Sequence, residues 1–213
     1  MMKSIIWIIL AGLLITGNFT VAAVDPAVVQ GQNDWTVDVK FTNLQQIEVK
    51  VPGQRATQRF WYSIITLTNK TNRDVDFFPK CQLMTDTFQI VSAGKKTPAA
   101  VFEQIKTRYQ TKFPFVEPLE KVENRILQGA DNSRDIAVIW PDFDPEAKAA
   151  TLFITGLSNE TAVIKHPVLK DNDGMPKLIF LRKTLELNYD LASDPTFRSE
   201  TRLTFKSKRW IMR

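Results

Sequence analysis

The stretch Phe60-Trp-Tyr-Ser-Ile-Ile-Thr-Leu-Thr68 decides the fold of this chain of 213 residues. Most of its side chains are aromatic or β-branched, which is the composition of a buried β-strand. The polar segment Asn69-Lys-Thr-Asn-Arg-Asp74 follows and indicates a turn. A second apolar segment, Val75-Asp-Phe-Phe78, then runs to Pro79. The sequence therefore predicts a long buried strand, a turn and a short second strand.

Segments of strand character flank this stretch on both sides. Residues 35–41 and 47–51 alternate apolar and polar side chains, so each should bury one face. Other extended segments are predicted along the rest of the chain. They cover residues 82–91, 135–140, 150–155, 162–169, 177–189 and 201–208. Between two of them, Asp171-Asn-Asp-Gly174 is a strong turn sequence and predicts a long hairpin.

One helix is predicted at about residues 98–110. Thr97 should cap its N-terminus, and Pro98 should occupy its first turn. Apolar side chains at helical spacing should pack on a sheet, and cations near the C-terminal end favour the helix dipole. The apolar stripe is Val101, Phe102, Ile105 and Tyr109, and the cations are Lys106, Arg108 and Lys112. Residues 117–128 also have helical spacing, but a proline and a glycine bracket them, so their structure stays open.

The balance of these elements predicts the fold class. Eight or more short strands with a single helix favour a mainly β protein, an antiparallel immunoglobulin-like β-sandwich. The helix at about 98–110 should be an insertion between strands that caps one end. Residues 24–213 contain no internal repeat, low-complexity stretch or linker, so we expect them to form a single β-sandwich domain.

The first 23 residues have the layout of a signal peptide. Lys3 gives a basic start, residues 5–15 are an almost unbroken apolar run, and Val21-Ala-Ala23 offers small residues for cleavage. The apolar run is shorter than the roughly 20 residues that a membrane-spanning helix needs. We therefore expect residues 1–23 to be a signal peptide. The mature form should be exported to the bacterial periplasm or the extracellular space and should not span the membrane.

The net charge indicates which classes of partner are favoured. The formal charge is +5, and loss of Lys3 with the leader leaves a charge near +4. Mild basicity of this kind favours an acidic protein or an acidic envelope surface. It is too weak and too dispersed for nucleic acid, which requires a dense basic stripe. We expect no nucleic-acid partner.

Three stretches together resemble an immunoglobulin-like sandwich family of small exported bacterial proteins of the planctomycete type. The first is the strand, turn and strand of residues 61–79. The second is Leu127-Gln-Gly129 followed by Ile136-Ala-Val-Ile-Trp-Pro141, and the third is Phe153-Ile-Thr-Gly-Leu-Ser158. The resemblance implies a β-sandwich without a catalytic motif. It also implies one known role, that of a small subunit that organises a larger periplasm-side assembly.

The histidine and cysteine content excludes several kinds of catalytic site. His166 is the only histidine, so a blue-copper site and a zinc site with several histidine or cysteine ligands are excluded. A Ser/His/Asp triad would have to recruit His166, which precedes a proline and has no nucleophile elbow nearby. Cys81 is the only cysteine, and we expect it to be buried. The alternatives are a dyad with His166 and an intermolecular disulfide.

Two acidic segments imitate calcium-binding loops. Asp142, Asp144 and Glu146 fall at alternate positions, as oxygen ligands of calcium can. A polar loop shaped by prolines explains them more simply. Residues 171–174 imitate the start of a calcium loop, but Arg182 stands where the completing glutamate would be, so a hairpin turn is the better explanation. We predict no catalytic residue, no cofactor and no metal site.

The C-terminal segment is the candidate docking site. It concentrates the cations Arg202, Lys206, Lys208, Arg209 and Arg213, with Trp210 and Ile211 among them. The predicted docking strip consists of Arg202, Lys206, Lys208, Arg209 and Trp210. An edge strand protected from aggregation by charge explains the same pattern. The functional alternative is a strip that docks an acidic partner, with Trp210 as the anchor. Strict alternation should place the cations at 202, 206 and 208 on the face opposite Phe205.

These features favour a non-catalytic exported β-sandwich that acts as an interaction or accessory subunit of an extracytoplasmic assembly. Its partner should be a protein or an acidic envelope surface, and a homo-oligomer stays open. One alternative is a binding module for a cell-envelope glycan, lipid or small ligand, with a groove lined by Trp35, Trp61 and Tyr62. The other is an enzyme that uses carboxylates or a calcium ion.

Overall fold

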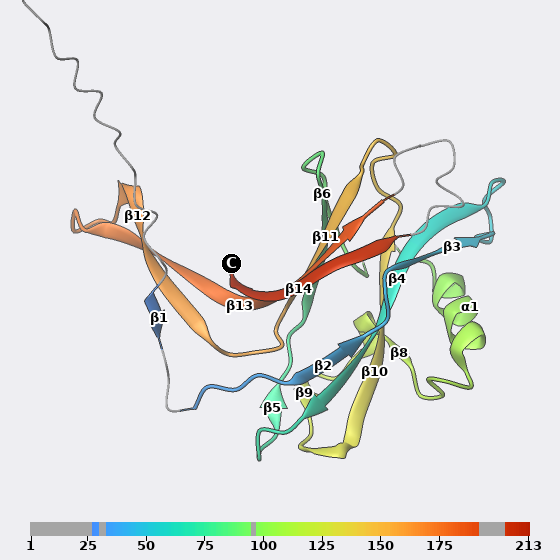
Figure 1. The fold of residues 1–213 in the computed structure, drawn as a ribbon, viewed down its shortest axis with the longest axis horizontal. Coiled ribbons are helices and arrows are strands. Elements are labelled where there is room, and N and C mark those ends of the chain that lie inside the picture. The colour runs from blue at the N-terminus through green and yellow to red at the C-terminus, as the bar shows by residue number, and fades with distance from the viewer. Residues whose placement is uncertain (1–26, 30–32, 95–96, 192–202) are drawn as a thin grey trace, which may run out of the picture.

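The computed structural model describes residues 27–29, 33–94, 97–191 and 203–213 (Figure 1). The predicted signal peptide at residues 1–23 and Arg202 lie outside the described residues. Within the described residues strands predominate, and α1 (Ala99–Tyr109) is the one α-helix. The prediction of a mainly β-sandwich with one helix is therefore confirmed. Its immunoglobulin-like character stays a prediction.

The larger of two packed sheets has seven strands. They are β1 (Ala27–Val29), β6 (Lys80–Thr85), β7 (Ile90–Ser92), β11 (Ala149–Thr155), β12 (Thr161–Lys170), β13 (Pro176–Asp190) and β14 (Thr204–Met212). Their order is β1-β12-β13-β11-β6-β7, and β14 also pairs with β13. All of these pairs are antiparallel.

The smaller sheet has five strands and is built around the stretch that the sequence singled out. They are β2 (Asp38–Phe41), β3 (Gln45–Val49), β4 (Gln58–Asn69), β8 (Glu117–Pro118) and β10 (Gly129–Pro141). β4 is central, because β10 pairs with one edge while β2 and β3 share the other. A separate two-stranded sheet consists of β5 (Val75–Asp76) and β9 (Arg125–Ile126).

Successive side chains of a strand point to opposite faces, so β4 contributes to two cores. On one face, Trp61, Ile65 and Leu67 are buried in the main core between the sheets. The larger sheet contributes Leu152 and Leu187 to the same core. Burial of one such side chain contributes about 1.5–3 kcal/mol. This interface therefore holds the two sheets together.

Helix α1 covers the opposite face of β4. Val101 and Ile105 of the helix are buried against Tyr62 and Ile64 of β4. Figure 1 shows the helix beside β3 and β4. The helix thus forms a third layer on the smaller sheet, and the prediction that it caps one end of the sandwich is wrong. The physical reason is that β4 is apolar on both faces, so its outer face also requires an apolar cover.

Three local predictions also need correction. Pro98 is the N-cap residue of α1 and no side chain caps this end, so Thr97 does not act as the cap. Residues 117–128 form no α-helix but contain β8, a 3₁₀ turn at Leu119–Lys121 and β9. Residues 82–91 are split between β6 and β7, because the chain turns at Phe88, which has a φ of 64°.

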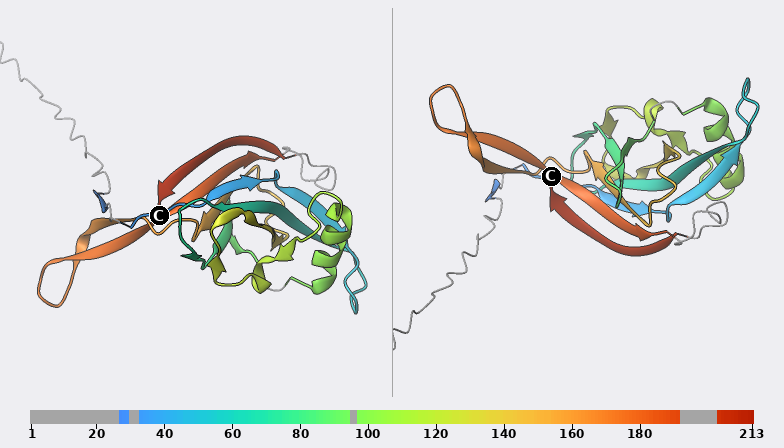
Figure 2. Two further views of the ribbon diagram at one scale, coloured as in Figure 1. Left: turned by 90° about the horizontal axis from the view of Figure 1, so that it is seen from below. Right: turned by 90° about the horizontal axis from the view of Figure 1, so that it is seen from above.

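The β12–β13 hairpin extends away from the body (Figure 2). β11 and β12 follow one another along the same edge of β13, opposite residues 184–190 and 178–182 respectively. β14 accompanies β13 on its other edge only from residue 182 onward. The predicted turn closes the hairpin, where the Asp171 carboxylate accepts hydrogen bonds from the main-chain N–H groups of Asp173 and Met175. We call residues 163–181 the arm.

Candidate functional site

The arm carries several exposed apolar side chains. They are Val168, Leu169, Met175, Leu178 and Phe180. Phe180 is 67% exposed and Val168 is 79% exposed, whereas Trp61 in the body is fully buried. Large apolar side chains exposed within one short hairpin are a feature of surfaces that contact another molecule.

His166 shapes the strand that presents two of these side chains. Its Nδ1 atom accepts hydrogen bonds from the main-chain N–H groups of Val168 at 3.1 Å and Leu169 at 2.8 Å. Pro167 has no N–H group to pair with β13, and the pairing register of β12 shifts across this segment. The imidazole therefore holds an irregular turn of the arm. This role is structural, since Nδ1 is occupied by the main chain.

A pocket of about 380 Å³ lies where the arm joins the body, on the face of the larger sheet that points away from the core. Phe78 and Phe180 line it and are 63% and 67% exposed. Three cations, Lys80, Arg182 and Arg213, line it with them. Among the described residues no acidic side chain lines this pocket, and none forms an ion pair with Lys80 or Arg182. We call it the arm-root pocket.

Phe78 is held outward by the backbone around it. Between β5 and β6, the preceding Phe77 is fully buried, whereas Phe78 is 63% exposed, so the two neighbouring rings diverge. Gly156 has a φ of 95°, and a Cβ atom there would lie only 2.6 Å from the carbonyl oxygen of Phe78. Glycine alone combines this φ with so close an approach. The backbone from which the exposed Phe78 ring extends is therefore held close to Gly156.

Arg213 is positioned over the sheet by three contacts. Its guanidinium carbon lies 4.0 Å from the centroid of the Phe153 ring. Its Nη1 atom donates to Gln82 Oε1 at 3.3 Å. Its main chain exchanges two hydrogen bonds with Arg182, at 2.8 and 3.1 Å. Arg182 and Arg213 are thus direct cross-strand neighbours.

A second pocket, of about 450 Å³, shares part of this lining. Trp35 and Glu160 line it. Glu160 Oε1 accepts hydrogen bonds from Lys183 Nζ and, at 2.9 Å, from Thr36 Oγ1. The hydrogen bond from Lys183 is the main cause that lowers the pKa of Glu160 below its ordinary value. This ionised pair fixes the point at which β12 leaves the body.

The predicted docking strip pairs with β13, and two of its cations form ion pairs with acids of that strand. Arg202 lies outside the described residues, and the other four residues lie on β14. Lys206 forms an ion pair with Asp190 at 2.7 Å, and Arg209 forms one with Glu186 at 2.6 Å. Burial raises the pKa of Glu186, but hydrogen bonds from Arg209 and Asn188, together with the charges of Arg209 and Arg213, outweigh it, and the net pKa is lowered.

The cations of the docking strip do not all lie on one face of β14. The pairing of β13 with β14 skips Lys206, which forms a bulge. Lys208 and Phe205 consequently lie on the same face, and both approach the ring of Phe41 to 5.6 Å. Trp210 is partly buried against the main core. The prediction of strict alternation is wrong for this reason, and docking through the strip stays a prediction.

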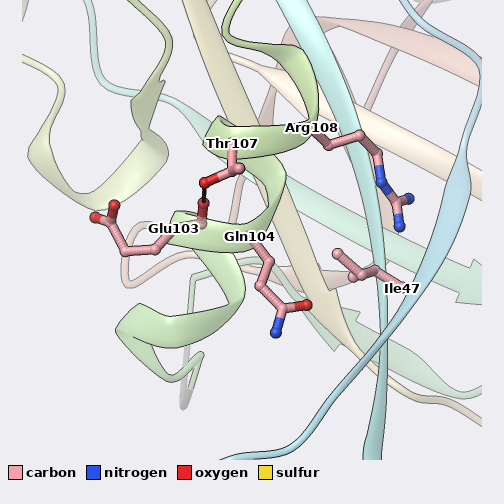
Figure 3. Close-up of a pocket in the computed structure, with 5 residues that line it drawn as sticks. All are labelled: Ile47, Glu103, Gln104, Thr107 and Arg108. Atoms are coloured by element: carbon pink, nitrogen blue, oxygen red, sulfur yellow. Dashed lines mark hydrogen bonds between the residues drawn. The ribbon is translucent and has the colours of Figure 1, made fainter.

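A groove of about 370 Å³ between α1 and β3 is lined by Ile47, Glu103, Gln104, Thr107 and Arg108 (Figure 3). Thr107 Oγ1 donates to the main-chain carbonyl oxygen of Glu103 at 2.9 Å, within the helix. Arg108 donates to Tyr62 Oη at 3.1 Å. Burial is the largest cause that raises the pKa of Tyr62. The contact between Arg108 and Tyr62 joins the helix to the sheet, and we assign it to the fold.

The other side chains considered for chemistry serve the fold. Cys81 is buried as predicted, and burial raises the pKa of its thiol to about 12. Asp142 accepts a hydrogen bond from Trp61 Nε1 at 2.7 Å, and Asp144 accepts one from Thr87 Oγ1. Both carboxylates therefore hold their loop in place. In the parts of the chain that the structure describes, no group of three histidine, cysteine or acidic side chains is arranged to hold a metal ion.

The aromatic groove considered from the sequence does not form. Trp61 and Tyr62 are both fully buried, so they line no surface groove. They do not form the expected groove because Trp61 packs into the main core on one face of β4 and Tyr62 packs under α1 on the other face. Trp35 is partly exposed and lines the pocket beside Glu160.

Sequence reasoning did not single out the arm-root pocket. One signal was present, because adjacent phenylalanines in a strand cannot both face the core, so Phe77 and Phe78 had to diverge. A second was Arg182, a cation within an apolar strand segment. Strand pairing is what brings Lys80 of β6 and Arg213 beside them, across many intervening residues.

Comparison with known proteins gives no match for this chain. No protein-family model, no curated protein and no solved structure matches it. The resemblance to exported immunoglobulin-like proteins therefore stays a prediction. Over the described ranges, no helix combines the length and the apolar character that crossing a bilayer requires.

Proposed function

We propose that this chain is a non-catalytic exported β-sandwich that acts by contact, as an interaction or accessory subunit of an extracytoplasmic assembly. The arm is the observation that carries the proposal. It extends from the body and exposes large apolar side chains on both of its strands, Val168 and Leu169 on β12 and Leu178 and Phe180 on β13. The signal-peptide pattern of residues 1–23 supports the extracytoplasmic location.

Burial of the arm against a partner is energetically favourable. Complete burial of three such side chains from full exposure contributes about 5–9 kcal/mol, and the arm side chains contribute less because they are already partly covered. Association costs about 4–15 kcal/mol through lost translational and rotational freedom. The arm can therefore contribute to a protein interface, and further contacts must add to it in a stable complex.

The charges of the arm favour a protein over a membrane surface. The two acids at its tip, Asp171 and Asp173, are flanked by Lys165 and Lys170 on one side and by Lys177 on the other. A segment that binds anionic lipid has a polar face rich in lysine and arginine. The mixed charges of the arm resemble the polar rim of a protein interface instead.

Affinity isolation of the tagged chain from its native host tests the proposal. The comparison is between the wild type and an arm variant with Val168→Ser, Leu169→Ser, Leu178→Thr and Phe180→Thr. We expect the wild type to retain a partner at fixed stoichiometry and the arm variant to lose it without a change in thermal unfolding. A matched control carries Ile90→Thr, Phe115→Ser and Leu127→Ser, which are exposed positions outside the arm.

Two results contradict the proposal. One is a wild type that sediments as a solitary monomer and retains no stoichiometric partner. The other is an arm variant that keeps the partner while the control variant loses it. N-terminal sequencing of the exported form, expected to begin near Val24, checks the location separately.

A second candidate function is a binding module for a cell-envelope glycan or small ligand. The pocket of about 450 Å³ favours it, because Trp35 lies there beside the polar side chains of Ser158 and Asn159. Aromatic faces flanked by hydrogen-bonding groups suit such ligands. Calorimetric titration with soluble cell-wall fragments tests it, and Trp35→Ala should abolish any heat of binding.

A further inference from the structure

We infer that the arm-root pocket receives a carboxylate-bearing segment of a protein partner. The carboxylate would lie among Lys80, Arg182 and Arg213, and an adjacent apolar side chain would pack on Phe78 and Phe180. The inference rests on the proposed function and names the chemistry of the partner at one site.

The first argument is the cross-strand pair of arginines. Arg182 and Arg213 exchange two main-chain hydrogen bonds, so their side chains start on the same face as direct neighbours. Like charges directly opposite each other on antiparallel strands are destabilising. An anion placed between the two guanidinium groups removes this repulsion. It also gains charge-assisted hydrogen bonds, which are about twice as strong as neutral ones.

The second argument is that no acidic side chain lines this pocket. Glu186 binds Arg209 at 2.6 Å and also interacts with the charge of Arg213, and Glu160 binds Lys183. Asp76 and Glu160 line the adjoining pocket, in which Arg182 also lies. Within the described part of the chain, the positive charge of the arm-root pocket is therefore not balanced by an acidic side chain in its own lining.

The third argument is preorganisation. Stacking on Phe153 and the hydrogen bond to Gln82 hold the guanidinium group of Arg213 over the sheet. The close approach of Gly156 to the Phe78 carbonyl oxygen fixes the backbone from which that ring extends. A site whose groups are already placed loses less conformational entropy when its ligand binds.

The shape and lining of the site favour an acidic protein segment over a lipid surface. The pocket is a hollow of about 380 Å³ flanked by two phenylalanines, not a broad basic face. Binding to anionic lipid usually depends on four to eight clustered cations. An acidic side chain with an apolar neighbour matches both the charge and the exposed rings.

Peptide titration of the full exported chain tests the inference. The probe is an acetylated and amidated peptide of ten residues in which glutamate alternates with valine and phenylalanine. The matched probe carries glutamine in place of every glutamate. We expect at low salt an affinity at least about tenfold higher for the glutamate peptide, and this advantage should shrink as salt rises.

Charge-reversal variants locate the site. Arg182→Glu combined with Arg213→Glu should remove the preference for glutamate, and a lysine version of the peptide should then bind instead. A control with Lys106→Glu and Lys121→Glu changes the net charge equally at exposed positions elsewhere and should keep the wild-type preference. Should the double arginine variant fail to fold, Arg182→Gln alone should reduce the preference about tenfold.

Three outcomes overturn the inference. They are equal affinity for the glutamate and glutamine peptides, an equal loss in the control variant, and tighter binding to phosphatidylglycerol vesicles through the same two arginines. If one of these occurs while the arm variant still loses its host partner, the proposed function stands and only the chemistry assigned to this pocket is wrong. If the arm variant keeps its partner, the proposed function fails whatever the peptides show.

Discussion

The body and the arm use the same kinds of residue with opposite results. In the body, the apolar side chains of β4 are buried on both faces, between the two sheets and under α1. In the arm, Leu178 and Phe180 also lie on a β-strand but face solvent. The difference teaches that periodicity sets which side chains share a face, whereas burial depends on whether a second layer covers that face.

The length of β13 explains where the cover ends. β13 has 15 residues, whereas β11, its partner in the body, has 7. The part of β13 beyond residue 184 lies over the smaller sheet and contributes Leu185 and Leu187 to the main core. The remaining part runs past that sheet into the arm. An apolar hairpin that outruns its own core has a surface left for another molecule.

The largest expected effect compares the two adjacent phenylalanines. Phe77→Ala should lower the free energy of unfolding by about 3–5 kcal/mol, because it opens a cavity in the main core. Phe78→Ala should change it by at most about 0.5 kcal/mol, because its ring is 63% exposed. Urea unfolding monitored by tryptophan fluorescence measures both. Similar losses of unfolding free energy in the two variants would contradict the assignment of Phe77 to the core and of Phe78 to the surface at the arm root.

The next effect compares two glycines of positive φ. Gly156→Ala should cost about 2–3 kcal/mol, because a Cβ atom meets the Phe78 carbonyl oxygen at 2.6 Å in addition to the unfavourable φ. Gly174→Ala in the turn of the arm should cost about 1 kcal/mol, since nothing lies within 4 Å of its Cβ position. Urea midpoints measured at equal slope provide the comparison. If Gly174→Ala were as costly as Gly156→Ala, the close approach at the arm root would be irrelevant.

A smaller effect concerns the ion pair at the junction of body and arm. The pKa of Glu160 is lower in the folded chain than its unfolded value of about 4.3, chiefly because Lys183 donates to it. Ionised Glu160 therefore stabilises the fold above that pH, and the stabilisation is lost as the pH falls through the folded pKa. Glu160→Gln should flatten the acid side of the curve of unfolding free energy against pH.

A second variant checks the assignment to this pair. Glu160→Gln combined with Lys183→Met leaves no charge unpaired and should show the same flattened curve with a smaller loss at pH 7. An unchanged acid limb in both variants would place the dependence elsewhere, for example at Glu186, whose pKa is also lowered.

The smallest expected effect lies within the arm. Phe180→Thr removes an exposed ring and introduces a β-branched residue, so the free energy of unfolding should change by less than about 0.5 kcal/mol. The same urea unfolding experiment measures it beside Phe77→Ala. A loss above about 2 kcal/mol would mean that the ring is buried in the folded chain, and the arm would then belong to the body.

The local sequence pattern predicted most of the strands, but it did not predict features that depend on how the elements pack together. The alternation at 35–41 and 47–51 led to β2 and β3, and the turn at 171–174 closes the predicted hairpin. The helix was placed to within a residue or so, but its position as a third layer was missed. That position depends on the outer face of β4, and a sequence pattern does not say which element will cover a given face.

The candidate site was less accessible to sequence reasoning than the fold. The docking strip was predicted from the cations concentrated at residues 202–209 around Trp210, and strict alternation was expected to set their faces, but the bulge at Lys206 breaks that alternation. The pattern contained no signal for the bulge, because it arises from pairing with β13. The arm-root pocket combines Phe78 with residues about 100 positions later, and only strand pairing makes them neighbours.

The sequence by itself determined the class of the fold, the hairpin, the burial of Cys81 and the shortage of histidine and cysteine ligands, because these follow from local periodicity and composition. The tertiary structure alone decided which apolar faces are covered, where the arm leaves the body and which cations meet at its root. The physical reason is that burial and charge clustering are properties of surfaces in contact, and those surfaces are assembled from strands far apart in the chain.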